Sequence, residues 1–217
     1  DAGSVTLQAS ASSGTLNWYN APTGGTSLGT GTSFTTPSIS ISTNFYVEST
    51  NGTCTSTRTA VLASVNLTPS ITSTFPSQVC DSGSVTLGAT ANSGTINWYN
   101  VASGGSVLGT GTSFTTPSIS TTTTFYAEAV NSGCNSVRVP VVATVNSTPS
   151  ITSTTDLTIC GNVGGTLSAT TSAGTVYWYT VASGGTSFAT GTSIPVSGGS
   201  YTFYAEAVSN GCTSARV

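Results

Sequence analysis

Gly94-Thr95-Ile96-Asn97-Trp98-Tyr99-Asn100 is the stretch that decides the fold, because apolar and polar residues alternate along it. The alternation predicts a strand with Ile96 and Trp98 on the buried face and with Asn97 and Tyr99 facing outward. A closely similar stretch stands at residues 14–20 and another at residues 174–180, so the chain repeats itself with a period of 80 residues. A unit of that length is the size of a small β-sandwich and too long for a solenoid repeat.

Strand signals on both sides of this stretch complete the middle copy. The expected strands cover residues 70–74, 85–89, 95–100, 107–108, 113–116, 123–130 and 137–145. Turn signals roughly every 8–12 residues and a Trp on the third strand are typical of an immunoglobulin-like sandwich. We therefore expect an all-β chain of tandem immunoglobulin-like β-sandwich repeats, with about seven strands each. Pro140 places the last strand at a sheet edge or at a bulge.

The repeat sets the expected domain boundaries at residues 1–66, 67–146 and 147–217. Asp1 aligns with Asp81, so the first strand of repeat 1 is expected to be missing, and Val217 aligns with Val139, so the last strand of repeat 3 is expected to be truncated. The chain therefore looks like a window of a longer tandem array. The joint Thr-Pro-Ser-Ile-Thr-Ser-Thr stands unchanged at residues 68–74 and 148–154, and joints this short favour a semi-rigid string.

The composition excludes several classes of function. Lys and Arg together number 3, Asp and Glu 6, and the net charge is −3 with no His. Such a chain cannot neutralise a run of phosphates, so we expect no nucleic-acid partner. It has no long apolar run, so we expect no membrane insertion. Without His or Lys the usual general bases and most metal ligands are missing, so we expect neither a cofactor nor an enzyme.

Each repeat carries one Glu and one Arg ten residues apart, centred on the last hairpin loop. The pairs are Glu48 with Arg58, Glu128 with Arg138, and Glu206 with Arg216. Cross-strand ion pairs are the expected arrangement, each contributing roughly 0.2–1 kcal/mol. A carboxylate site is the alternative, but a hydrolytic site needs two acids close together.

Two aromatic residues recur side by side in the alternating stretch. Trp18, Trp98 and Trp178 fall on the inward phase, where core packing is expected rather than stacking on sugars. Tyr19, Tyr99 and Tyr179 fall on the outward phase. They are the candidate contacts for a ligand such as a surface polysaccharide, although an outward Tyr on a strand also follows from β-propensity alone.

The cysteines form two alternating classes, one before the second strand and one in the last hairpin loop. The first class is Cys80 and Cys160, and the second is Cys54, Cys134 and Cys212. No zinc motif accompanies them, so disulfides in an oxidising, extracellular compartment are expected. The partner of Cys54 is expected to lie outside the chain.

Two disulfide connectivities stay open. Pairing within a repeat, Cys80 with Cys134 and Cys160 with Cys212, is the first expectation. It conflicts with an ordinary immunoglobulin topology, in which these positions lie at opposite poles, because the Cα atoms of a bridge must lie within about 7 Å. The alternative joins Cys80 at the base of one repeat to Cys212 at the top of the next.

Several recurrent motifs together resemble the immunoglobulin-like repeats of Bacteroidetes surface proteins. The motifs are Cys80-x-x-Gly83-Ser84-Val85-Thr86-Leu87, Trp98-Tyr99, Gly104-Gly105, Phe125-Tyr126-Ala127-Glu128 and Gly133-Cys134. The resemblance covers the whole chain. It implies a large secreted adhesin, such as the gliding-motility adhesins exported by the type IX route, and it brings no catalytic or ligand residues. Similar repeats also act as spacers in secreted polysaccharide-degrading enzymes.

The sequence therefore predicts a structural stalk or filament segment of a bacterial cell-surface adhesin. Its expected partners are the neighbouring repeats, other copies in a fibre, and a surface polysaccharide. A carbohydrate-binding or spacer module of a secreted polysaccharide-active enzyme is the alternative.

Overall fold

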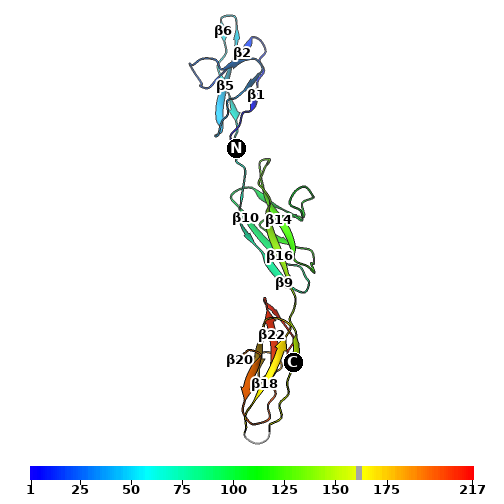
Figure 1. Cartoon of the computed structure of the whole chain (residues 1–217). Helices are drawn as coiled ribbons and strands as arrows, with labels where there is room; N and C mark the ends of the chain where they lie inside the picture. The colour runs from blue at the N-terminus through cyan, green and yellow to red at the C-terminus, as the bar shows by residue number, and fades with distance from the viewer. Residues whose placement is uncertain (160–162) are drawn as a thin grey trace. The chain divides into compact units, whose positions relative to one another are not determined.

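The computed structural model describes residues 1–159 and 163–217. These residues form strands, turns and loops, and no helix among them is long and apolar enough to cross a membrane. The strands of each repeat form separate sheets (Figure 1), which confirms the all-β, immunoglobulin-like architecture predicted from the alternating stretches.

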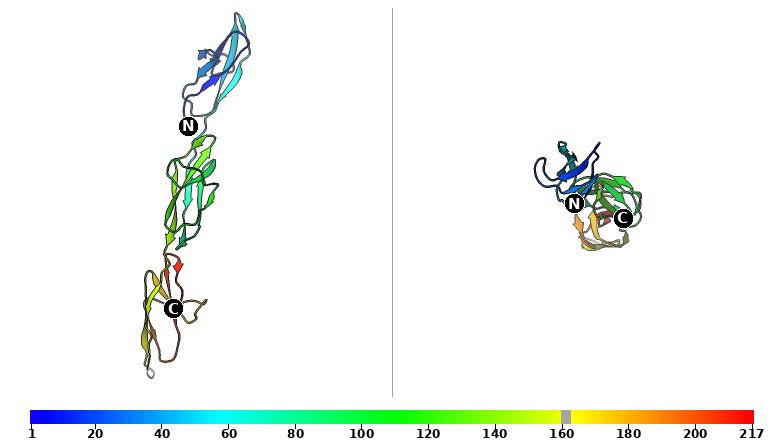
Figure 2. Two further views of the ribbon diagram at one scale, coloured as in Figure 1. Left: turned by 90° about the vertical axis from the view of Figure 1, so that its right-hand side faces the viewer. Right: turned by 90° about the horizontal axis from the view of Figure 1, so that it is seen from above.

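Repeat 2 (residues 67–146, largely green in Figures 1 and 2) shows the most complete arrangement. One sheet has the strand order β13-β10-β8, and the other has the order β12-β11-β14-β16-β9 with β15 paired to β14. The strands are β8 (Ile71–Phe75), β9 (Ser77–Cys80), β10 (Thr86–Ala91), β11 (Thr95–Tyr99), β12 (Gly109–Thr110), β13 (Ser113–Thr115), β14 (Thr123–Asn131), β15 (Cys134–Asn135) and β16 (Val139–Asn146).

Within the described residues, repeats 1 and 3 follow the same plan with fewer strands. Repeat 1 contains β1 (Thr6–Gln8), β2 (Thr15–Tyr19), β3 (Gly29–Thr30), β4 (Ser33–Thr35), β5 (Thr43–Asn51), β6 (Cys54–Thr55) and β7 (Thr59–Ala63). Repeat 3 contains β17 (Ile151–Thr154), β18 (Gly165–Thr171), β19 (Thr175–Tyr179), β20 (Ala189–Thr190), β21 (Ser193–Val196), β22 (Tyr204–Ser209) and β23 (Cys212–Thr213).

Strand β9, like the two-residue strand β15, is an element of repeat 2 that the sequence analysis does not predict. After β8 the chain passes Pro76 and joins the other sheet, where β9 pairs in parallel with the end of β16 from Ser77↔Ala143 to Cys80↔Asn146. Because the two strands run in the same direction, they end at the same pole of the repeat. Cys80 therefore lies beside the last residue of β16.

Pro140 lies at the position that the sequence predicts. It stands opposite Tyr126 of β14, outside residues 143–146 of β16 that pair with β9. No strand pairs with the second side of β16 at Pro140 in the described part of the chain, so this edge tolerates a residue without an amide proton.

The core of repeat 2 surrounds Trp98, which is fully buried. Its ring stacks on Phe114 with the ring centroids 5.5 Å apart, and Phe114 lies 5.4 Å from Phe125. Ala89 of β10 and Ala127 of β14, which belong to the two facing sheets, are also buried in this core. Small residues there let the two sheets close on the Trp ring without a covalent bond.

The chain divides into two compact units. One consists of Asp1–Ser70 with Val130–Ser136, and the other of Ile71–Ala129 with Val137–Val217. The first unit thus combines repeat 1 with the tip of the β14–β15 hairpin, and the second holds the rest of repeat 2 with repeat 3. The repeat boundaries after residues 66 and 146 stay predictions.

Candidate functional site

A disulfide joins Cys80, the last residue of β9, to Cys212, the first residue of β23, with the Cα atoms 5.7 Å apart. The expected pairing within repeats is therefore wrong, and the alternative pairing across the junction is confirmed. The parallel pairing of β9 with β16 places Cys80 at the base of repeat 2, whereas Cys134 lies in the β14–β15 hairpin. Cys160 lies outside the described residues, and Cys212 is already bonded to Cys80.

Asn146 is the centre of the polar contacts around this bond. Its carbonyl accepts the amide of Asp81 at 2.8 Å and lies 3.8 Å from Cys212 Sγ. Its side-chain Nδ2 donates to Gln78 Oε1 and to the carbonyl of Asn210, both at 3.1 Å. The last residue of β16 thus holds the hairpin of repeat 3 through its side chain, while its backbone carbonyl holds Asp81 of repeat 2.

The first unit repeats this pattern around Asn66. Asn66 Nδ2 donates to the carbonyl of Ser132 at 3.3 Å, and its own carbonyl accepts the amino group of Asp1 at 2.5 Å. The Cys134 thiol donates to the same carbonyl at 4.0 Å. Cys134 and Cys54 are free thiols, and Cys54 is exposed. The hydrogen bond from this Asn to the hairpin of the following repeat therefore forms in both places. At Asn146 a disulfide through Cys212 accompanies it, whereas at Asn66 the neighbouring Cys134 is a free thiol.

Asp81, which follows the bonded Cys80, contacts the start of the recurrent joint at residues 148–154. Its Oδ1 accepts the backbone amide of Thr148 at 2.8 Å. This hydrogen bond, with a further one from the Thr148 side chain, lowers the pKa of the Asp81 carboxyl from its ordinary value of 3.8 because both donors favour the charged form. Asp1 makes the equivalent contacts, accepting from the amide and hydroxyl of Thr68 at 3.2 and 2.7 Å.

The three Glu–Arg pairs form as expected. Arg58 Nε lies 2.9 Å from Glu48, Arg138 Nε 3.6 Å from Glu128, and Arg216 Nε 2.9 Å from Glu206. In each pair both side chains are largely buried, with 10–14% exposed. The carboxylate accepts hydrogen bonds from Tyr19 and Arg58 in repeat 1, and these lower the pKa of Glu48 from its ordinary value of 4.5.

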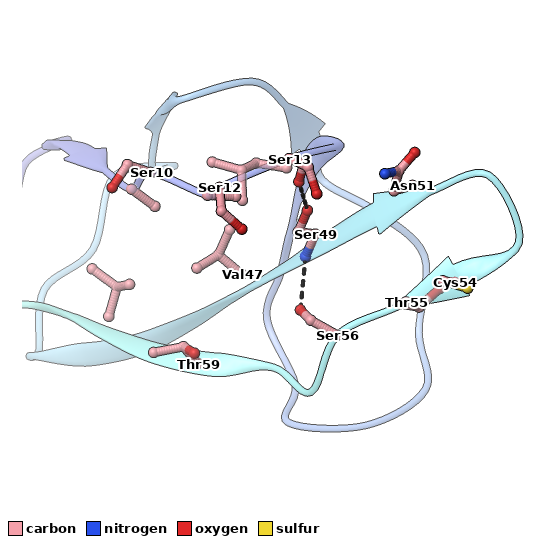
Figure 3. Close-up of a pocket in the computed structure, with 14 residues that line it drawn as sticks. Ser10, Ser12, Ser13, Val47, Ser49, Asn51, Cys54, Thr55, Ser56 and Thr59 are labelled. Atoms are coloured by element: carbon pink, nitrogen blue, oxygen red, sulfur yellow. Dashed lines mark hydrogen bonds between the residues drawn. The ribbon is translucent and has the colours of Figure 1, made fainter.

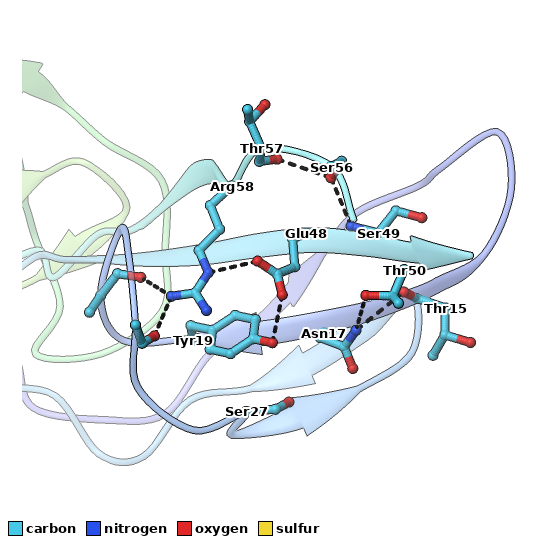
Figure 4. A network of polar contacts seen from close by, with 12 residues as sticks. Thr15, Asn17, Tyr19, Ser27, Glu48, Ser49, Thr50, Ser56, Thr57 and Arg58 are labelled. Atoms are coloured by element: carbon cyan, nitrogen blue, oxygen red, sulfur yellow. Dashed lines mark hydrogen bonds and ion pairs between the residues drawn. The ribbon is translucent and has the colours of Figure 1, made fainter. Parts of the chain in front are cut away.

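The Arg of each pair also covers the recurrent Tyr, as Figure 4 shows for Arg58 and Tyr19. The Arg58 guanidinium lies 3.3 Å from the ring centroid of Tyr19, and the Tyr hydroxyl donates to Glu48 at 2.7 Å. Arg58 Nη1 donates as well to the carbonyls of Ala21 and Gly24, at 2.8 and 2.7 Å. The cation–π contact and the hydrogen bonds together pin the loop after β2 to the sheet.

This arrangement corrects the expectation of an exposed ligand platform. Arg138 covers Tyr99 and Arg216 covers Tyr179 at the same 3.3 Å. Tyr99 is only 6% exposed and Tyr179 only 9%. One face of each ring is therefore already occupied by a guanidinium of the same chain.

The three Trp residues are core residues, as the strand phase predicts. Trp18 and Trp98 are 0% exposed and Trp178 is 3% exposed. Each indole Nε1 donates to a glycine carbonyl, in Gly31, Gly111 and Gly191, at 2.8–2.9 Å. Buried Trp needs such a partner. The bond holds the turn between β3 and β4 and the equivalent turns between β12 and β13 and between β20 and β21. Within residues 1–159 and 163–217, no three His, Cys, Asp or Glu side chains gather where they could hold a metal ion.

Sequence reasoning missed the roles of Asn66 and Asn146. Each stands two positions before an identical Thr-Pro-Ser-Ile-Thr-Ser-Thr joint. The recurrence of an Asn at that fixed place was the available signal. Its function became visible only with β9 in place.

Two structures of Sidekick-1 are among the solved structures that this chain resembles. The immunoglobulin domains 1–5 of Sidekick-1 match with a TM-score of 0.44 and 14% identity, over 99% of this chain and 55% of that chain. The chain thus spans about half of that structure's length. Sidekick-1 domains 1–4 match with a TM-score of 0.39 and 15% identity, over 99% of this chain and 69% of that chain.

No curated protein matches the sequence. A family model described as "Ig-like domain CHU_C associated" matches residues 1–66, 67–146 and 147–217 in turn. Together the three matches cover the whole chain, so this protein belongs to the family of CHU_C-associated immunoglobulin-like domains.

Proposed function

We propose that the chain is a non-catalytic, load-bearing stalk segment of an extracellular bacterial surface adhesin. The disulfide between Cys80 and Cys212 carries this proposal, because it joins the base of one repeat to the hairpin of the next. A covalent bond at that place is of little use to an isolated binding module. It is useful where consecutive repeats must stay together under tension.

The bond changes the path that a pulling force takes through the chain. Cys80 and Cys212 are 132 positions apart. A force applied at the two ends passes from Cys80 directly to Cys212, so the residues between them carry no tension while the bond is intact. The cores around Trp98 and Trp178 both lie in this protected segment.

Strands β9 and β16 provide a second resistance when the bond is absent. They pair in parallel over four registers, from Ser77↔Ala143 to Cys80↔Asn146. Tension on repeat 2 pulls β9 toward its beginning and β16 toward its end, so their hydrogen bonds are loaded in shear. Shear must break these bonds together, whereas peeling breaks them one at a time.

The extracellular location rests on the same bond. Disulfides persist in oxidising compartments and are rare in the cytosol. The resemblance to repeats of Bacteroidetes surface proteins adds the class of adhesin and the type IX export route to the proposal. The partners proposed for each repeat are its neighbours in the chain, held by contacts such as that between Asn146 and Asn210.

Electron microscopy of the source cells, with gold-labelled antibodies raised against this chain, tests the proposal. A stalk segment predicts label along extended surface fibres with a regular repeat. Label confined to compact secreted particles would contradict it and would assign the chain to a spacer of a secreted enzyme. A polysaccharide pull-down with the wild-type chain and with Tyr99→Ala distinguishes a carbohydrate-binding module from a stalk segment and from an enzyme spacer. Only a binding module would be retained by the polysaccharide and lose that retention in the variant.

A further inference from the structure

Phe75, the last residue of β8, is 56% exposed on repeat 2. It stands opposite Gly88 of β10, whose neighbours Leu87 and Ala89 point into the core. Because side chains alternate between the two faces of a sheet and residues opposite each other share a face, the Phe75 side chain lies on the outer face. An aromatic ring is thus presented to solvent outside the core.

The Phe75 side chain rests on the backbone of Gly88. A Cβ atom at residue 88 would lie 3.0 Å from Phe75 Cδ2 and 3.3 Å from Phe75 Cβ. A side chain on residue 88 would therefore collide with the ring, and the glycine is what lets the ring approach β10 so closely. One side of Phe75 is held against the sheet, and the rest of it stays exposed.

Repeat 3 builds the same place without a ring. Thr155 and Ser168 stand there instead of Phe75 and Gly88. Thr155 Oγ1 lies 2.8 Å from Ser168 Oγ and accepts the Ser168 amide at 2.9 Å. Strand β17 still pairs with β18. The sheet therefore does not require an aromatic residue here, so Phe75 adds an apolar surface that the fold itself does not need.

The surroundings of the ring are neutral and rich in hydroxyl groups. Strands β8, β10 and β13 contain no Asp, Glu, Lys or Arg. The exposed Ser113 stands opposite Gly88 on its other side, about 10 Å from Phe75 across two strand spacings. In the next row the hydroxyls of Thr86 and Thr115 lie 3.2 Å apart. A ring among neutral donors and acceptors suits a ligand that is itself neutral and carries hydroxyls.

The apolar area is that of one ring. Among the residues of these three strands, all of which the structure describes, Phe75 is the one large apolar residue that is exposed. A Phe side chain presents at most about 150–250 Å², whereas a stable protein interface takes about 800 Å² from each partner. The patch is too small for a protein partner. It matches a single sugar ring, whose C–H groups form an apolar face and whose hydroxyls project from its edge.

The pocket on repeat 1 shows the contrast (Figure 3). It has a volume of about 500 Å³ and is lined by serines and by aliphatic residues such as Val47 and Val61. None of the described residues that line it is aromatic. A sugar ring therefore finds no stacking surface there, whereas Phe75 offers one.

We propose that Phe75, seated on Gly88, is a stacking platform for a neutral polysaccharide, with the hydroxyl of Ser113 bonding a sugar unit beside the stacked one. One ring with a few neutral hydrogen bonds gives a dissociation constant of roughly 1 mM. Tyr99, which Arg138 covers, takes no part, so binding through Phe75 persists in Tyr99→Ala. The inference is independent of the proposed stalk function, and its failure leaves that proposal unaffected.

Two-dimensional ¹H–¹⁵N NMR of the full chain, titrated separately with cellohexaose, chitohexaose and laminarihexaose, tests the binding. Binding at Phe75 should shift the amide signals of residues 73–75, 86–90 and 113–115 with one common dissociation constant. Residues 153–155, 166–170 and 193–194 of repeat 3 are the internal control and should not shift. The absence of shifts in residues 73–75 with all three sugars, or equal shifts in both repeats, overturns the proposal.

Two variants separate the ring from the fold. Phe75→Thr/Gly88→Ser gives repeat 2 the pair with which repeat 3 folds, and it should weaken binding at least about tenfold. Phe75→Tyr keeps the ring and should bind within about threefold of the wild type. Unchanged binding by the double variant, or equal weakening by both, overturns the proposal. Shifts that appear without sugar and grow with protein concentration also overturn it, since the ring would then contact a second copy of the chain.

Discussion

Cys80 and Cys212 are 132 positions apart in the sequence, yet their Cα atoms lie 5.7 Å apart and their sulfur atoms are bonded. The bond exists because β9 runs parallel to β16 and brings Cys80 to the base of repeat 2. Asn146, at the end of β16, holds the Asn210 turn of repeat 3 beside it. One short strand thus decides how two sandwiches are joined.

Removing this bond should destabilise the second unit. The double variant Cys80→Ser/Cys212→Ser should unfold with a free energy lower by about 2–5 kcal/mol, because the unfolded chain loses the constraint of a long closed loop. Urea unfolding measures the difference. Cys54→Ser, which changes an exposed free thiol, is the control and should match the wild type. Equal stability of the double variant and the wild type would contradict a structural role for the bond.

Asn146 should guide formation of the bond. After reduction, Asn146→Ala should reform the Cys80–Cys212 link about two- to tenfold more slowly, since one hydrogen bond to Asn210 is lost. Thiol trapping followed by mass spectrometry gives the rate. Asn66→Ala removes the equivalent contact to Ser132 in the first unit and should leave this rate unchanged. Equal slowing by both variants would show a general folding defect instead.

Asp81 should make the second unit sensitive to acid. Its folded-state pKa is lowered by the hydrogen bonds from Thr148. The contribution is therefore complete above the unfolded-state pKa and is lost as the pH falls through the folded-state value. Asp81→Asn should lower the melting temperature at pH 7, and the difference from the wild type should shrink as the pH falls below 3.8 and through the lowered folded-state pKa. A difference that persists unchanged in acid would contradict this assignment.

The planar geometry of the Arg138 guanidinium should contribute more to the stability of repeat 2 than its positive charge does. Arg138 Nη1 donates to the carbonyls of Val101 and Gly104 at 2.8 and 2.7 Å while the fork covers Tyr99. Arg138→Lys keeps the charge but loses this geometry, so unfolding of repeat 2 should become easier by about 1–3 kcal/mol. Val142→Thr, an exposed change on the neighbouring strand, should alter stability by less than about 0.5 kcal/mol. Denaturant titration of both variants measures the two changes in unfolding free energy. Equal changes for Arg138→Lys and Val142→Thr would contradict this role of the guanidinium.

Much of the fold could be predicted because the same pattern of apolar and polar residues occurs in all three repeats. The alternation around Trp98 gave the buried face, and the ten-residue spacing of Glu128 and Arg138 gave the ion pair. β9 could not be predicted, because residues 77–80 are too few to show a period and Pro76 reads as a loop. The pairing of Cys80 depended on that strand, so the preferred disulfide was wrong.

The surroundings of Tyr99 were hidden for a different reason. The alternation along a strand predicts from which face of the sheet a side chain projects, and Tyr99 does project from the face opposite to Trp98. The alternation does not predict which other residues cover that face. Arg138 arrives from a segment 39 positions later and lies flat on the ring, so an outward residue is buried without joining the core.

Pulling a single chain from its two ends tests the central claim most directly. With the Cys80–Cys212 bond intact, only the first 80 residues and the last six can extend, which gives a limiting length of about 30 nm. The reduced chain, or the double variant Cys80→Ser/Cys212→Ser, should extend to about 75 nm. A limit near 30 nm that rises to the longer value on reduction is the predicted result. Extension of the oxidised chain to about 75 nm would contradict a load path through the disulfide.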